Sequence, residues 1–232
     1  MTNTAASLPV SYQPLLAEMF PSALLYRMYG LTECKRVAYL EPELVATKGE
    51  SVGKAIPGTE TMVLRPDGTH VAPGETGVLH VRGPHVMVGY WGRPVETAKM
   101  QVAGALPGER VLNTQDFFRV DEDGFLYFVG RSDDIIKTRG EKVSPVEVEN
   151  CLYAMPGVLE AAVIGVHDAL LGQAVRAYVV LDKSMELNER AVRGWCSARL
   201  EAFMVPKEIV VMDSLPKTTS GKIAKSRLAS DS

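Results

Sequence analysis

The sequence has little cysteine and no histidine pattern that suggests a metal site. Its three cysteines, Cys34, Cys151 and Cys196, are far apart in a chain of 232 residues and form no Cys-x-x-Cys pair. The four histidines include no His-x-x-x-His pair. We therefore expect neither a disulfide framework nor a zinc or histidine metal site, and unpaired thiols fit a cytoplasmic location best.

Excess charge of one sign and long apolar runs are also absent. The formal net charge is −3, and lysine and arginine are interleaved with acidic residues. Because binding to nucleic acid depends on neutralising phosphates, a nucleic-acid partner is not expected. No segment approaches the ~20 apolar residues of a membrane span, and the start has no basic and apolar leader. With 46% hydrophobic and 23% charged residues, the composition is that of a globular protein.

The hydrophobic pattern changes twice along the chain. Helix-like spacing predicts a helix over residues 8–20, and an apolar run predicts a buried strand over residues 23–30. From residue 49 to 130 short alternating runs are separated by turn sequences such as RPDG and DEDG, with one helical segment at 94–100. This texture predicts a small β-barrel or sandwich.

The last hundred residues predict a compact α+β unit. Strands are expected at 133–138, 159–166, 174–182 and 206–213, and helices at 144–155 and 188–200. Ser144, Pro145 and Glu147 form a capping-box arrangement at the start of the first helix. The predicted organisation has three parts: a remnant of a large α/β domain (1–48), a β-barrel-like subdomain (49–131) and a small mobile α+β domain (132–232).

Polar clusters stand at the ends of predicted strands, where functional groups are usually displayed. The stretch YGLTE combines an aromatic ring, a hydroxyl and a carboxylate. Asp116 is expected to end a strand, and Arg131 to follow the second strand of the same hairpin. A carboxylate is suited to the vicinal hydroxyls of a ribose, and arginine to sugar or phosphate oxygens. Near the end of the chain, Lys222 follows a glycine in a loop.

Four motifs together resemble the adenylate-forming superfamily, which contains acyl-CoA synthetases, adenylation domains of peptide synthetases and luciferases. They are YGLTECKRV, GETGVLHVRGPHVMVGYW, the long stretch from TQDFFRVDEDGF to KVSPVEVE, and LPKTTSGKIAKSRL. The resemblance implies an AMP-forming acid–thiol ligase. Such a ligase uses ATP, Mg²⁺, a carboxylic acid substrate, and CoA or phosphopantetheine as thiol acceptor.

The resemblance also implies roles for individual residues. Tyr29 would stack on adenine, Gly30 would belong to the same nucleotide site, Thr32 would contact phosphate, and Glu33 would bind Mg²⁺. Asp116 would bind ribose, and Arg131 would be a second contact to ribose or phosphate. Asp133 would be the hinge between domains. The turn containing Gly140, Glu141 and Lys142 would line the tunnel for the thiol, and Lys222 would be the adenylation lysine.

The sequence departs from the family pattern in two places. Gln115 stands where the family usually has the glycine of Thr-Gly-Asp, and if that position needs a positive φ, Asp116 could be displaced. The phosphate loop rich in Ser, Thr and Gly, and most of the large domain, have no counterpart here. Residues 1–48 are therefore expected to expose apolar surface or to pair with another chain, such as an N-terminal half.

Three interpretations follow from this missing part. The chain is the C-terminal part of a ligase that is active only when completed by an N-terminal half. Alternatively, it is a non-catalytic module that binds a partner, a carrier protein or a nucleotide, or it is an inactive remnant. The presence of Lys222, together with the other candidate site residues, favours the ligase, because an interaction module has no need of that lysine.

Overall fold

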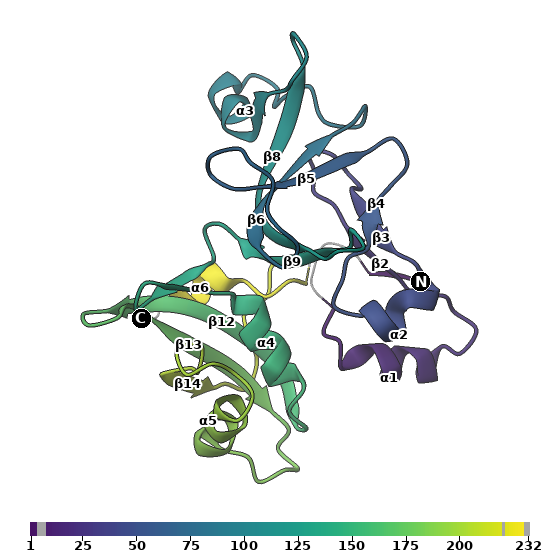
Figure 1. The fold of residues 1–232 in the computed structure, drawn as a ribbon. Helices are drawn as coiled ribbons and strands as arrows, with labels where there is room; N and C mark the ends of the chain where they lie inside the picture. Colours follow the sequence, from purple (N-terminus) through teal and green to yellow (C-terminus); the bar gives the residue numbers. More distant parts are fainter. Residues whose placement is uncertain (4–7, 220, 230–232) are drawn as a thin grey trace. The chain divides into compact units, whose positions relative to one another are not determined.

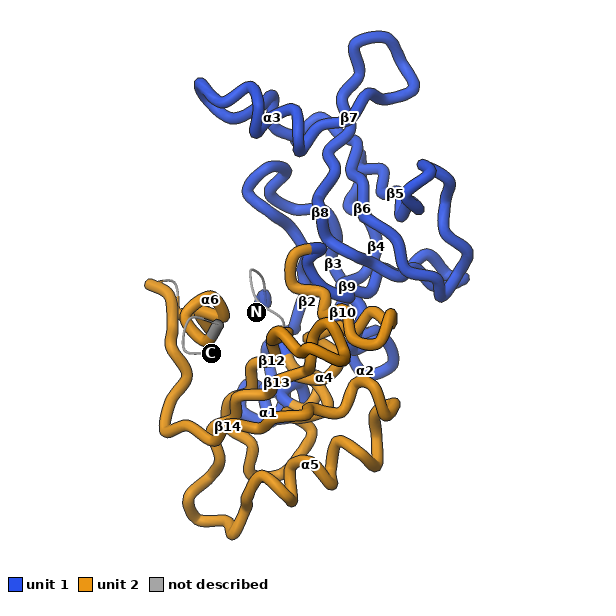
Figure 2. The backbone as a smooth tube through the Cα atoms, turned by 90° about the vertical axis from the view of Figure 1, so that its left-hand side faces the viewer, with its two compact units in different colours: residues 1–8, 12–132 blue, residues 9–11, 133–232 orange. Residues whose placement is uncertain are grey.

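A computed structural model of the chain describes residues 1–3, 8–219 and 221–229 (Figure 1). The chain divides into two compact units. The first contains Met1–Leu8 and Tyr12–Ser132, and the second contains Pro9–Ser11 and Asp133–Ser232 (Figure 2). Among the described residues no helix has the length and apolar character needed to cross a membrane.

The first unit begins with a small four-stranded sheet. Strand β2 pairs in parallel with β1 and antiparallel with β3, and β3 pairs antiparallel with β4. The elements are β1 (Thr2–Asn3), α1 (Tyr12–Met19), β2 (Tyr26–Tyr29), β3 (Ala38–Leu40), a 3₁₀ turn (Pro42–Leu44), α2 (Val45–Lys48) and β4 (Lys54–Ala55). The helix expected over 8–20 and the strand expected over 23–30 are thus both present, and both are shorter than the apolar pattern indicated.

Helix α1 leaves much of its apolar surface exposed. Leu15 is 53% exposed, Met19 69% and Phe20 48%, and Leu24 beyond the helix is 58% exposed. The buried residue of α1 is the polar Gln13, whose side-chain amide donates to the carbonyl oxygen of Gly49 at 2.7 Å. In the single chain, residues 1–48 therefore expose apolar surface, which is one of the two outcomes expected for them.

A five-stranded antiparallel sheet forms the rest of the first unit. Its order is β5-β6-β8-β7, and β9 also pairs with β8. The elements are β5 (Glu60–Leu64), β6 (Thr76–Arg82), α3 (Pro94–Met100), β7 (Gln101–Ala103), β8 (Arg110–Val120) and β9 (Leu126–Arg131). No pairing in the described part of the chain joins β5 to β7 or β9, so the described strands form an open sheet, and of the small β-barrel or sandwich that the sequence predicted, the barrel is not confirmed.

One hydrophobic core serves both sheets of the first unit. Cys34 and Val37, which lie before the five-stranded sheet in the sequence, pack with Leu79, Leu112 and Phe118 from its strands, and all five are at most 1% exposed. The small sheet is therefore packed against the larger one, and the turn that holds Cys34 and Val37 is fixed by side chains from strands 42 to 84 residues further along the chain.

The second unit is a mixed sheet with helices. Its sheet order is β11-β10-β13-β12, and β14 pairs in parallel with β13. The elements are β10 (Ile136–Thr138), β11 (Glu141–Val143), α4 (Pro145–Tyr153), β12 (Val158–Asp168), β13 (Gly172–Leu181), α5 (Glu189–Ser197), β14 (Glu208–Val211) and α6 (Lys225–Ala229). Every strand and helix that the sequence predicted in this part of the chain is present.

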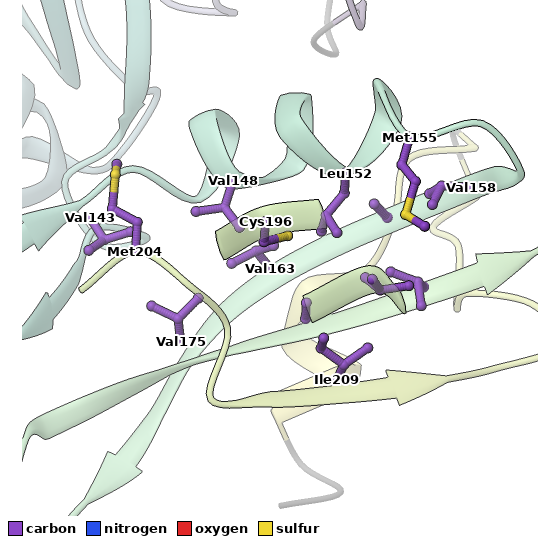
Figure 3. Packing of buried hydrophobic residues seen from close by; sticks show 14 of the residues in the cluster. Val143, Val148, Leu152, Met155, Val158, Val163, Val175, Cys196, Met204 and Ile209 are labelled. Carbon is purple, nitrogen blue, oxygen red and sulfur yellow. The ribbon is translucent and has the colours of Figure 1, made fainter. Parts of the chain in front are cut away.

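The alternation of β12 gives this sheet two buried faces. Ala161 and Val163 point into a core shared with helices α4 and α5, which Figure 3 shows from close by. Ala162 and Ile164 point to the opposite face, where Leu228 of α6 packs. At the start of α4, the hydroxyl of Ser144 accepts the backbone N–H of Glu147, which is half of the predicted capping box.

Candidate functional site

Tyr29 and Asp116 lie together in the first unit. The hydroxyl of Tyr29 donates to Oδ2 of Asp116 at 2.5 Å. The Tyr29 ring packs against Phe118 edge to face, with centroids 4.7 Å apart, and lies nearly parallel to Phe128 at 6.3 Å. Burial and the neighbouring carboxylate raise the pKa of Tyr29 well above its ordinary value, so the phenol stays a neutral donor. An aromatic ring and a carboxylate are thus fixed side by side.

The carboxylate is carried by an irregular segment inside β8. We had expected Asp116 at the end of a strand, but β8 continues to Val120, and Asp116 pairs with Arg131, the last residue of β9. The strand runs on because Phe117 and Phe118 continue the pairing with β6 and β9 after a register shift. The expectation that one hairpin holds Asp116 and Arg131 is confirmed.

Gln115 has a φ of 59°, in the left-handed region that favours glycine. Its N–H donates to the side chain of Asn113 at 2.9 Å, and its carbonyl accepts the N–H of Ser132 at 2.9 Å. The hydroxyl of Thr114, 2% exposed, accepts the N–H of Asp116 at 3.2 Å and donates to the carbonyl of Leu79 at 2.8 Å. Glutamine therefore adopts the backbone conformation that the family's glycine suggested, and Asp116 stays in register.

Glu33 lies in the turn between β2 and β3. The hydroxyl of Tyr90 donates to Oε1 of Glu33, and the N–H of Met87 donates to its carbonyl oxygen at 2.7 Å. Burial first, and then the Glu33 carboxylate, raise the pKa of Tyr90 to about 12. Tyr90 stands at the GYW end of the second family motif, but nothing in the sequence indicated its contact with Glu33. A hydroxyl donor 57 positions away gives no periodic signal, so only the fold reveals the contact.

The same turn fixes Gly30 and Thr32. A Cβ atom at Gly30 would lie 1.8 Å from the carbonyl oxygen of Lys35, so no larger residue fits without moving the backbone. Thr32 is exposed. Glu33 is a single carboxylate, and within the described ranges no three His, Cys, Asp or Glu residues gather as metal ligands. Since Mg²⁺ is commonly held by one or two carboxylates and by substrate phosphates, Glu33 fits such a site.

In the second unit, Asp133 is exposed and comes first after the division between the units. Arg139 and Gly140 form the two-residue turn between β10 and β11, with φ values of 54° and 87°. Two positive φ values are typical of a tight type I′ hairpin turn. Glu141 and Lys142 follow in β11 and are exposed. The four predicted residues are therefore all exposed and lie within residues 133–142, between buried positions such as Ile136.

Lys222 lies in a loop that closes on itself. The N–H of Thr218 donates to the carbonyl of Lys222 at 2.7 Å, and the N–H of Lys222 donates to the hydroxyl of Thr218 at 3.2 Å. Gly221 has a φ of 82°. Ser220 lies outside the described residues. Lys222 is exposed.

Comparisons with known proteins agree with these observations. The family described as AMP-binding enzyme matches residues 1–91, and the AMP-binding enzyme C-terminal domain matches residues 147–222. The long-chain-fatty-acid–CoA ligase of Escherichia coli O157:H7 is 38% identical over 200 residues, which are 86% of this chain and 34% of the ligase.

Two solved structures superpose on almost the whole chain. The ATP-bound crystal structure of MatB from Rhodopseudomonas palustris matches 99% of this chain and 44% of its own, with a TM-score of 0.86 and 31% identity. The o-succinylbenzoate CoA synthetase of Bacillus subtilis, in complex with an acyl-adenylate intermediate, matches 98% and 45%, with a TM-score of 0.85 and 32% identity. This chain spans less than half the length of each of these relatives. Because both family models match it, the chain belongs to the family of AMP-binding enzymes.

Proposed function

We propose that the chain is the C-terminal part of an ATP-dependent, AMP-forming acid–thiol ligase. The observation that carries this proposal is the fixed pairing of the Tyr29 ring with the Asp116 carboxylate. An aromatic face suits a nucleobase, and a buried carboxylate suits ribose hydroxyls, so the pair has the chemistry of a nucleoside site. The proposal is supported by the ATP-bound and acyl-adenylate-bound relatives.

In the proposed reaction a carboxylate oxygen of the acid attacks the α-phosphorus of ATP, and pyrophosphate leaves. Lys222 stabilises the negative charge that develops on the α-phosphate. Arg131 contacts ribose or phosphate oxygens, and Thr32 donates its hydroxyl to phosphate. Glu33 would hold Mg²⁺, which would supply positive charge to neutralise the phosphates. Tyr90 keeps the Glu33 carboxylate oriented through its hydroxyl.

In the second half of the reaction, a pantetheine thiol of CoA or of a carrier protein attacks the acyl carbon, and AMP leaves. We assign the turn of Gly140, Glu141 and Lys142 to the path of the thiol, and Asp133 to the hinge about which the second unit turns. The similarity to a long-chain-fatty-acid–CoA ligase supports CoA or a related pantetheine thiol as the acceptor.

We further propose that an N-terminal half completes the enzyme. Leu15, Met19 and Phe20 of α1 and the neighbouring Leu24 present apolar side chains that a folded protein normally covers. The α1 surface is thus the part of the first unit where we expect this half to pack.

The nucleoside site is tested by isothermal titration of the full chain with a non-hydrolysable acyl-adenylate mimic, an acyl-sulfamoyl adenosine. Asp116→Ala removes a charged hydrogen-bond acceptor and is expected to weaken binding by about 10- to 100-fold. Asp123→Ala removes an exposed carboxylate of the same unit and serves as the matched control. Equal binding by the wild type and Asp116→Ala would refute the nucleoside site, and no binding by either would favour a non-catalytic module or a remnant.

A further inference from the structure

The loop that carries Lys222 is a closed hairpin. Lys217 and Ile223 pair as an isolated antiparallel bridge, and Thr218 bonds to Lys222 in both directions, through its N–H and its hydroxyl. After the bridge, the N–H of Ala224 donates to the carbonyl of Pro216 at 2.8 Å. The position of Lys222 is therefore set by whatever holds the two legs of this hairpin.

The first leg is held by Glu160 of strand β12. One oxygen of Glu160 forms an ion pair with the ammonium of Lys217, and the other accepts the N–H of Leu215 at 3.2 Å. Leu215 itself is 3% exposed and packs with Ala162 and Ile164 on this face of the sheet. The carboxylate and the buried leucine fix the chain just before the hairpin.

The second leg is held by Glu149, which belongs to helix α4 on the other side of the sheet. In the described part of the chain β12 pairs only with β13, so its outer edge is open. At this edge Oε1 of Glu149 accepts the N–H of Val163 at 2.8 Å and lies 2.6 Å from the ammonium of Lys225. Glu149 thus accepts a backbone N–H at the open edge of β12 and also forms an ion pair with the first residue of α6.

Both partners of this pair are mostly buried, in contrast to the exposed pair of Lys183 and Asp213 in the same unit. The Glu149 side chain is 15% exposed and that of Lys225 is 27% exposed, whereas those of Lys183 and Asp213 are 84% and 89% exposed. Burial raises the pKa of Glu149, and the Lys225 charge opposes that rise. Charges that are withdrawn from water in this way are screened less by salt than exposed ones. The α6 end of the loop is also anchored by Leu228, whose carbonyl accepts the Tyr178 hydroxyl at 3.0 Å.

We propose that Glu149 and Glu160 are positioning residues for Lys222. By binding Lys225 and Lys217, they clamp the two legs of the hairpin onto β12, so that the reactive ammonium projects from a loop with both legs fixed when it reaches the α-phosphate. A lysine on an unrestrained tail would lose more conformational freedom at that step. This inference rests on the proposed function for the purpose of the loop, but the clamp itself is a property of the second unit.

The test is native-state hydrogen exchange of the full chain at the amides of Gly221, Lys222 and Ala224. Lys225→Met removes the charge and retains the aliphatic stem, and Lys225→Arg restores a cation at the same place. Lys217→Met tests the first leg in the same way, and Lys183→Met removes an exposed pair as a matched control.

We expect the three loop amides to exchange about 10-fold faster in Lys225→Met, equivalent to about 1.4 kcal/mol of local opening. In Lys217→Met, which breaks a pair whose lysine side chain is 50% exposed, we expect a smaller acceleration of about 3-fold. Amides of β12 and β13 should keep their wild-type protection, and Lys225→Arg and Lys183→Met should leave the loop unchanged. Unchanged loop exchange in both methionine variants, or equal acceleration throughout the unit, would overturn the proposal. If Lys225→Met does not fold, Lys217→Met decides the question.

The two proposals fail separately. The nucleoside site is tested by mimic binding that depends on Asp116 in the first unit, and the clamp by exchange in the second. If loop exchange is unchanged in both methionine variants while the mimic binds in a way that depends on Asp116, only the positioning role is refuted. Binding independent of Asp116, with the expected exchange results, would refute the proposed nucleoside site and leave the clamp established.

Discussion

The backbone of Gln115 offers the sharpest quantitative prediction. At a φ of 59° the Cβ atom of an L-residue is crowded by its own backbone, at a cost of roughly 1–2 kcal/mol. Gln115→Gly removes that crowding. Glycine also has more freedom in the unfolded chain, which costs about 0.5–1 kcal/mol. The difference is a net stabilisation of the first unit by about 0.5–1 kcal/mol.

The backbone contacts of this position survive the change. The N–H that donates to Asn113 and the carbonyl that accepts from Ser132 are present in any residue. Because the chain has two compact units, a single melting temperature does not report on the first one alone. The assay is therefore the free energy of opening from hydrogen exchange at Leu112 and Phe118, which are fully buried in the first unit.

Gln115→Ala is the matched control, since it shortens the side chain and keeps the Cβ atom. We expect no gain in the opening free energy from this variant. A gain equal to that of Gln115→Gly would show that the side chain, and not the backbone conformation, is the source of strain. A loss of stability in Gln115→Gly would refute the reasoning altogether.

Two further predictions concern pH. Tyr90→Phe should remove a tyrosine component with a pKa of about 12 from an ultraviolet difference titration, and an unchanged titration would contradict the Glu33 contact. The raised pKa stabilises the fold below pH 10, and this stabilisation is lost as the pH rises through 12. Asp168→Asn tests a carboxyl whose pKa is lowered to about 2, first by Lys207 and then by the N–H groups of Leu171 and Leu170. The contribution of this carboxyl to stability is present above pH 3.8 and is lost as the pH falls towards 2. When the free energy of unfolding is measured by denaturant at several pH values, it should therefore fall less steeply with decreasing pH in Asp168→Asn than in the wild type. Identical pH dependence of the two proteins would count against the ion pair of Asp168 and Lys207.

The sequence predicted the second unit better than the first. Strand and helix patterns between residues 133 and 213 are long and regular, and the N-cap at Ser144 is local, so each element was recognisable from its own residues. The short strands β3, β4 and β7 have two or three residues and no period to detect. Residues 49–131 alternate as a barrel would, but alternation does not determine whether a sheet closes.

The candidate site came from motifs and not from periodicity. Tyr29 and Asp116 are far apart in the sequence, and the resemblance to a family, not spacing, indicated that they meet. The same applies to Gln115, where the family's glycine suggested a positive φ. Tyr90 and Glu149 were missed, because a hydroxyl or carboxylate that supports a functional residue from another element leaves no local signal. Such supporting contacts can be recognised only in the folded structure.

The central claim is that the Tyr29 and Asp116 pair binds the nucleoside of an adenylate. The most direct measurement is a titration of the isotopically labelled full chain with AMP, followed by nuclear magnetic resonance at the Tyr29 ring and at the amides of Gln115 and Asp116. The account predicts saturable shifts at these positions that disappear in Asp116→Ala. Shifts confined to other parts of the chain, or the same shifts in Asp116→Ala, would contradict it.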